Sequence, residues 1–210
     1  FIDVEYDNYN MKYDEIHEKI SKKTKGIILV HIYGIVANVQ KIKKICKKNK
    51  IHFIEDAAES IGAKYNKKMA GSFGDVSVFS FNATKLIMAG QGGCLCTNNK
   101  KIFEKAKLFS HHGIDKKITG RYYWSSLLGY NYNWTNIQAA CAIAQLTRIN
   151  KLIKYKYKIY KLYKKYFSKI KNIEITKKLH DQKQTFWIVY AIAKKKINKE
   201  KFCNKFKKYN

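Results

Sequence analysis

Apolar residues occur along this chain in two arrangements, as short continuous runs and as stretches in which they recur every three or four positions. The run over residues 26–30 predicts a short buried strand, and the spacing that begins at Val39 predicts an amphipathic helix. A second strand is expected over residues 51–54. This order of strand, helix and strand is typical of a parallel pair with a right-handed crossover, so the sequence predicts an α/β fold.

The middle of the chain continues in the same way. Two more strands are expected over residues 76–81 and 94–97, separated by the glycine-rich turn Gly90–Gly93. A helix is expected over residues 100–109. Thr135 is expected to cap a long helix, because its hydroxyl can accept a hydrogen bond from the first helical turn.

The last third of the chain has a different pattern. The lysine- and tyrosine-rich stretch 151–167 is expected to prolong the helix that Thr135 caps, with its lysines in solvent and its tyrosines packed beneath. Residues 184–192 predict a strand, and Asn198 is expected to precede another helix.

Two domains follow from this order of elements: a large domain with a mainly parallel sheet over residues 1–150, and the start of a smaller α+β domain over residues 151–210. The chain begins at Phe1 rather than Met, and a strand-like run lies near each end. We therefore expect both domains to be incomplete, the first at its N-terminus and the second at its C-terminus.

The formal charge of +28 would by itself suggest a nucleic acid or an anionic surface as partner. However, only Arg121 and Arg148 are arginine, the residue that phosphate and base recognition usually favours. The lysines are spread along the whole chain, and codons rich in A and T would produce this enrichment in Lys, Asn, Ile and Tyr. We therefore expect no nucleic-acid partner. No segment approaches the length of a membrane span, so we expect no membrane partner either.

The five cysteines have neither the spacing of paired disulfides nor that of zinc ligands. Cys94 and Cys96 are two positions apart in an expected strand, so we expect both to lie on one face as small core residues. This cysteine usage fits a reducing cytoplasmic setting, and no metal site is expected.

Lys85 is the lysine whose surroundings indicate chemistry. It follows an apolar strand, as Asp56 does, and ligands of open α/β sheets collect at the carboxyl ends of the strands. A lysine able to form a Schiff base and a carboxylate able to keep a ring nitrogen protonated are the minimum requirement of pyridoxal phosphate chemistry. The pair predicts an enzyme. The alternatives are that Asp56 caps a turn and that Lys85 is a solvated loop residue.

Three neighbouring residues could complete such a site. Ser80 ends the same strand that leads to Lys85, and its hydroxyl could donate to a phosphate. Ala58 offers a small apolar face for a flat ring, and Glu59 could reach a ring hydroxyl. Each of the three could equally be structural. His31 is more simply explained as a packed or capping residue and is left out of the site, as is His112.

Five motifs occur in a fixed order: Val30–Gly34, Glu55–Ser60, Gly71–Asp75, Phe79–Phe81 followed by Lys85 and Gly92–Gly93, and Gly129–Tyr132. In this order they closely resemble the sugar aminotransferases of the DegT/StrS family. The Ala-Ala-Glu-Ser and Ser-Phe-Asn variants resemble its perosamine-synthase branch. The likeness covers nearly the whole chain.

The resemblance implies the aspartate-aminotransferase fold (PLP fold type I), pyridoxal 5'-phosphate as cofactor, and a homodimer with its active sites at the subunit interface. It implies that Lys85 is the Schiff-base lysine and Asp56 the partner of the pyridinium nitrogen. It also implies that Ala58 supports the cofactor ring and that Glu59 lies near the ring's phenolic oxygen. Ser80 would bind the phosphate, and Asn131 would bind the phosphate of the neighbouring subunit's cofactor.

By this resemblance we expect a cytoplasmic aminotransferase of polysaccharide biosynthesis. It would convert a nucleotide-linked keto sugar to an amino sugar, with an amino acid, glutamate by resemblance, as donor. Two departures are visible: Glu59 stands where many members carry Gln, and the family's N-terminal phosphate loop does not occur in these residues. The alternatives are a sugar dehydratase or deoxygenase of the same family, in which histidine can replace the lysine, and a basic nucleic-acid-binding protein.

Overall fold

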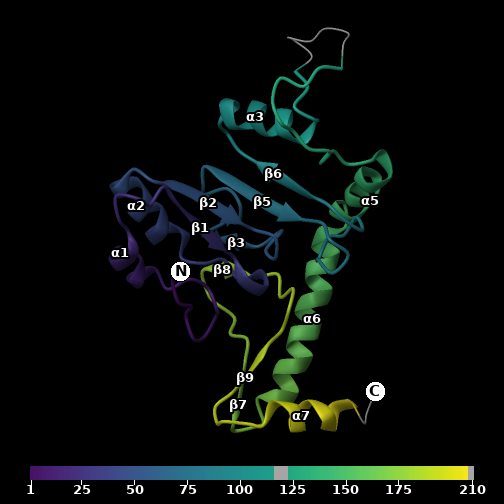
Figure 1. Ribbon diagram of the computed structural model, residues 1–210. Coiled ribbons are helices and arrows are strands. Elements are labelled where there is room, and N and C mark those ends of the chain that lie inside the picture. The colour runs from purple at the N-terminus through teal and green to yellow at the C-terminus, as the bar shows by residue number, and fades with distance from the viewer. Residues whose placement is uncertain (116–122, 208–210) are drawn as a thin grey trace.

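The computed structural model describes residues 1–115 and 123–207 (Figure 1). Its centre is a four-stranded sheet in the order β1-β2-β5-β6, formed by Gly26–Val30, His52–Asp56, Val76–Ser80 and Gly93–Cys96. β1, β2 and β5 run parallel, and β6 pairs antiparallel with β5. The prediction of an α/β fold with a mainly parallel sheet is therefore confirmed, with each expected strand shifted by no more than two residues at either end.

Helix α2 (Val39–Asn49) follows β1 and returns the chain to β2. Its buried side chains are Val39, Ile42, Ile45 and Cys46, the set that the 3.6-residue period of the sequence marks as apolar. They pack with residues of β1 and β2 in one hydrophobic core. Burying each aliphatic side chain contributes roughly 1.5–3 kcal/mol, which fixes the crossover against the sheet.

Several short elements surround this core. Before β1 the chain forms η1 (Tyr13–Glu15) and α1 (Ile16–Lys19), and after β1 it forms the turn η2 (Ile32–Gly34). A second, three-stranded sheet has the order β4-β3-β8, formed by Lys68–Met69, Lys64–Tyr65 and Gln182–Lys183. Because β8 comes from the last third of the chain, this sheet ties the C-terminal residues to the first part.

Two helices stand where the sequence predicts one continuous helix. Thr135 caps α5 (Asn136–Leu146) with a reciprocal capping box to Gln138, as expected for a helix start. This helix ends at Leu146, and after Thr147 and Arg148 the chain continues as a second helix, α6 (Ile149–Phe167). α6 leads from the large sheet to a small outlying group of elements, β7 (Ile173–Ile175), β9 (Ala191–Ala193) and α7 (Lys199–Phe206) (Figure 1). α3 (Lys100–Ser110) lies beyond β6.

The strand predicted over residues 184–192 is wrong for most of its length. Only Ala191–Ala193 is a strand, and Phe186 has a left-handed φ of 51°. The reason is that the aromatic side chains of this run pack in different directions: Phe186 stacks on Tyr160 of α6, whereas Tyr190 packs on Tyr9. A continuous run of apolar residues forms a strand only when neighbouring strands and packing surfaces receive its side chains on both faces.

The expectation that Cys94 and Cys96 are core residues is also wrong. Both lie on β6, whose four residues are all exposed. β6 is one of the two edge strands of the sheet, and no described element covers it in the way that α2 covers β1 and β2. The domain boundary near residue 150 stays a prediction. Among residues 1–115 and 123–207, no helix is long and apolar enough to cross a membrane.

Glu55 is a fully buried carboxylate in the middle of this architecture. His31 donates from Nε2 to Glu55 at 2.9 Å, because its Nδ1 already accepts the backbone N–H of Ala37. The backbone N–H groups of Gly71 and Gly74 donate to the same carboxylate at 2.9 and 2.6 Å, and that of Phe73 also donates.

Burial alone would raise the pKa of Glu55, but the hydrogen bond from His31 and those from Gly74 and Gly71 outweigh it and hold the pKa below its ordinary value. The carboxylate is therefore ionised in the folded protein. It ties the turn at residues 71–74 and the end of β1 to the central strand.

We predict that Glu55→Gln lowers the free energy of unfolding by about 2–4 kcal/mol, because the amide presents N–H groups to donors that need an acceptor. The depressed pKa means that this stabilisation is present above the unfolded-state pKa and is lost as the pH falls through the folded-state pKa. Urea unfolding from pH 7 downward measures both effects. The variant should lose part of the acid sensitivity of the parent.

The matched control is Glu18→Gln, on the exposed face of α1. It should change the free energy of unfolding by no more than about 0.5 kcal/mol. Equal stabilities for the two variants would contradict the anchoring role of Glu55.

Candidate active site

The predicted site residues Asp56 and Ser80 end two neighbouring parallel strands. Asp56 is the last residue of β2 and lies opposite Val78 of β5, two positions before Ser80. Both side chains therefore belong to the carboxyl edge of the sheet, where ligands of open α/β sheets bind. The expectation that one crevice receives Asp56 and Lys85 stays a prediction.

Asp56 is held in place by the turn that follows β2. The backbone N–H of Ala57 continues the ladder to Val78, and the N–H of Ala58 donates to Asp56 Oδ1 at 3.0 Å. In the described part of the chain this is the only hydrogen bond to the Asp56 carboxylate. The second oxygen is thus available to an N–H donor from a ligand.

Lys85 is directed back towards the sheet by a tight turn after β5, in which its N–H donates to the carbonyl of Asn82. Its Nζ lies 3.7 Å from Oε1 of Glu59, and the two side chains are only 15% and 20% exposed. The other oxygen of Glu59 accepts the backbone N–H of Tyr33 at 2.9 Å. The structure therefore brings two of the predicted residues into direct contact, as a partly shielded ion pair.

Ser80 uses its hydroxyl oxygen as an acceptor for the N–H of Asn82, at 3.3 Å. In the described part of the chain its hydroxyl hydrogen is not engaged by any other hydrogen bond. It is therefore available to donate to an anionic oxygen, the role that a phosphate-binding serine needs.

Asn131 is not brought to this group of residues. It is exposed and forms an isolated antiparallel bridge with His111, in the segment between α3 and α5. The rings of its neighbours Tyr130 and Tyr132 stack on each other at 5.0 Å. No contact in the described residues links Asn131 to Lys85 or Asp56 of the same chain.

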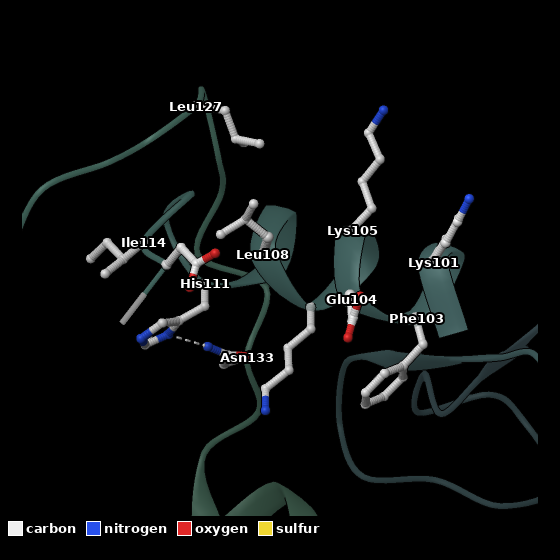
Figure 2. Close-up of a pocket in the computed structure, with 11 residues that line it drawn as sticks. Lys101, Phe103, Glu104, Lys105, Leu108, His111, Ile114, Leu127 and Asn133 are labelled. Carbon is white, nitrogen blue, oxygen red and sulfur yellow. Dashed lines mark hydrogen bonds between the residues drawn. The ribbon is translucent and has the colours of Figure 1, made fainter. Parts of the chain in front are cut away.

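A surface hollow lies elsewhere. It has a volume of about 910 Å³ and is bordered by α3 and the loops around it, so that it contains none of the six predicted residues. Figure 2 shows His111 beside Asn133, whose Nδ2 donates to His111 Nδ1 at 2.7 Å. This hollow does not contain the residues with suitable chemistry, and we place the candidate site at the strand ends.

Trp187 is a neighbour of Lys85 that the sequence analysis missed. Its indole ring lies under the lysine ammonium, with Nζ 4.3 Å from the ring centroid. The two residues are far apart in the sequence, and neither periodicity nor a motif marks this contact. Only the path of the chain through residues 184–187 shows it.

The donor set at the strand ends can be tested against pyridoxal phosphate by its chemistry. A primary amine, a carboxylate with a free oxygen and a hydroxyl with a free hydrogen match the cofactor's aldehyde, its ring nitrogen and its phosphate in turn. They are Lys85, Asp56 and Ser80. The residues present thus fit the group, and they lie on a sheet of the aspartate-aminotransferase fold class.

Comparison with known proteins identifies the family within that class. The chain belongs to the DegT/DnrJ/EryC1/StrS aminotransferase family, whose model matches residues 1–210. Aminotransferases of this family depend on pyridoxal phosphate. The family, the cofactor and the resemblance to perosamine synthases expected from the sequence are confirmed.

Individual relatives support the same assignment. The chain is 35% identical to a GDP-perosamine synthase of Escherichia coli O157:H7 over 97% of its own length and 55% of the relative. It superposes on the Helicobacter pylori aminotransferase PseC, involved in the biosynthesis of pseudoaminic acid, with a TM-score of 0.88 and 27% identity, covering 98% of this chain and 54% of that one.

The fold is shared beyond aminotransferases. An E. coli GDP-4-keto-6-deoxy-D-mannose-3-dehydratase with bound hydrated PLP superposes with a TM-score of 0.88 and 23% identity, over 100% of this chain and 57% of that one. This likeness shows the fold alone. The chain spans about half the length of the relatives it matches.

Proposed function

We propose that this chain acts in a pyridoxal-phosphate-dependent aminotransferase that converts a nucleotide-linked keto sugar to an amino sugar in polysaccharide biosynthesis. The observation that carries the proposal is the contact of Lys85 with Glu59 at the strand edge that also presents Asp56 and Ser80. The relatives named as GDP-perosamine synthase and as an aminotransferase involved in the biosynthesis of pseudoaminic acid support the substrate class.

The roles of the residues follow from their chemistry. When bound, the cofactor supplies an electron sink for the carbon next to the reacting nitrogen. Asp56, with one free carboxylate oxygen, would keep the ring nitrogen protonated. Ser80 would donate to the phosphate, and Ala58 would leave room for the flat ring. Lys85 would carry a proton on Nζ between the donor's alpha carbon and the cofactor.

Glu59 would have two functions in this scheme. It accepts the N–H of Tyr33 and pairs with Lys85, so it holds the lysine ammonium near the place where the amine must react. With the cofactor bound, the same carboxylate would lie near the phenolic oxygen of the ring. The amino donor would be an amino acid, with glutamate the candidate from the family resemblance.

A cytoplasmic location is part of the proposal. The five cysteines are free thiols, which fits a reducing compartment.

The first test replaces Lys85 with Ala in the protein expressed from its complete gene. The parent should show the visible absorbance of lysine-bound cofactor, and Lys85→Ala should lose it together with at least about a thousandfold of turnover, because no other amine can take its place. Lys68→Ala, on the exposed strand β4, is the control and should keep both. Retention of absorbance and turnover in Lys85→Ala would refute the assignment.

The dehydratase alternative shares the fold, and Lys85 argues against it because histidine can replace this lysine there. Analysis of the product decides between dehydration and amino transfer. We predict that incubation with a nucleotide-linked 4-keto sugar and glutamate gives a sugar whose mass has gained nitrogen, with release of 2-oxoglutarate. Mass spectrometry with ¹⁵N-labelled glutamate measures this directly. A product that has lost water and carries no label would favour the dehydratase.

We further propose that the protein is a homodimer in which Asn131 binds the phosphate of the partner's cofactor. The support is that the segment around Asn131 is both apolar and exposed: Leu128 is 80% and Tyr132 70% exposed. Exposed aromatic and aliphatic residues at this density favour an interface. The alternative that these aromatic residues pack within their own chain holds for Trp134, which lies edge-on to Phe81 at 4.9 Å.

Complementation between subunits tests the shared site. Lys85→Ala and Asn131→Ala chains should each be inactive or nearly so. After subunit exchange, one of the two sites in a mixed dimer regains both residues, so activity should recover to at most about one quarter of the parent value for statistical mixing. Unchanged inactivity despite exchange, shown by native mass spectrometry of differently tagged chains, would count against Asn131 acting in the partner's site.

A further inference from the structure

Trp187 contacts three separate parts of the chain at the candidate site. Its ring faces the Lys85 ammonium at 4.3 Å, and its indole N–H donates to the carbonyl of Thr84 at 2.9 Å. Its own backbone carbonyl accepts from Lys156 Nζ of α6 at 3.1 Å. One side chain thus holds both the amine of Lys85 and the peptide that precedes it.

The residues before Trp187 explain how it reaches this position. Phe186 has a φ of 51°, a left-handed conformation that is sterically unfavourable for a bulky residue. Its ring is buried and stacks on Tyr160 of α6 at 4.2 Å, which compensates the strain. The backbone N–H of Thr185 donates to the carbonyl of Gly34 at 3.1 Å. The strained residue reverses the direction of the chain, so that Phe186 enters the core and Trp187 faces Lys85.

Glu59 is the second contact of the Lys85 ammonium, with Oε1 3.7 Å from Nζ. Tyr33 connects Glu59 with Trp187, because its N–H donates to Glu59 and its ring packs against that of Trp187 at 6.4 Å. Tyr33 also has a left-handed φ, of 56°. The two residues with left-handed backbone, Tyr33 and Phe186, therefore adjoin the two side chains that contact the lysine, and such strained positions often occur at functional sites.

We infer that Trp187 is a positioning residue for Lys85, and this inference rests on the proposed function. The ring face attracts the ammonium, and the indole N–H fixes the Thr84 carbonyl, so that the amine of the cofactor-free protein is held between Trp187 and Glu59. Binding of the cofactor aldehyde then begins from an oriented amine rather than from a mobile one. The positioning residue belongs to the C-terminal third of the chain, whereas Lys85 belongs to the main sheet.

The test compares Trp187→Phe, which keeps an aromatic face but loses the N–H, with Trp187→Leu, which loses both. Trp124→Leu, at a solvent-exposed tryptophan, is the control. In the cofactor-free protein expressed from its complete gene, labelling by an acylating amine reagent is followed by mass spectrometry, with Lys68 as internal reference. In a second measurement the rise of visible absorbance after addition of pyridoxal phosphate gives the rate of cofactor capture.

We expect Trp187→Leu to label Lys85 about five-fold faster than the parent, relative to Lys68, and to capture the cofactor about five-fold more slowly. Trp187→Phe should lie between the two, with a melting temperature equal to that of Trp187→Leu. If Trp187 only filled space, the Phe and Leu variants of equal stability would have equal effects. Partial rescue by Trp187→Phe therefore indicates a role of the aromatic ring.

The inference is overturned if Trp187→Leu keeps both rates within about twofold of the parent, or if the Phe and Leu variants change equally. Failure of the proposed function is distinguishable, because Lys85→Ala would then keep the visible absorbance while the labelling rates still report the contact between Trp187 and Lys85.

Discussion

The buried carboxylate of Glu55 is the constraint on which the arrangement of the site depends. It accepts hydrogen bonds from His31, which directly follows β1, and from backbone N–H groups of the turn at residues 71–74, and so ties the end of β1 and the turn before β5 to β2. Successive side chains of a strand point to opposite faces. Because Glu55 must face its donors, its neighbour Asp56 faces away from them, towards the carboxyl edge. The direction of the Asp56 side chain is thus set by the hydrogen bonds of its neighbour Glu55.

Local pattern predicted much of the fold and part of the site. The four buried residues of α2 follow from its period, and the helix cap at Thr135 follows from residue type. Asp56 and Lys85 could be selected because each follows an apolar strand, a local feature with a known geometric consequence. Where one side chain or one backbone period decides the structure, the sequence is sufficient.

What the sequence could not predict depends on contacts between distant residues. Trp187 and Lys85 meet only because Phe186 adopts a left-handed backbone conformation that its own residue type disfavours, and the stacking partner that stabilises it lies on α6. The same limit applies to Glu55, since an isolated glutamate in an apolar strand gives no sign that four donors will surround it. In both places tertiary packing overrides local preference, and both lie at or next to the candidate site.

The edge strand β6 has a consequence for handling this protein. Its sequence, Gly-Cys-Leu-Cys, carries none of the charges or prolines with which natural edge strands prevent pairing with a second chain, and all four residues are exposed. Two copies that paired through this edge would bring the thiols of Cys94 and Cys96 close to those of their counterparts. Air oxidation would then turn a reversible association into a covalent one, so the redox state of a preparation would decide whether its aggregates dissolve again.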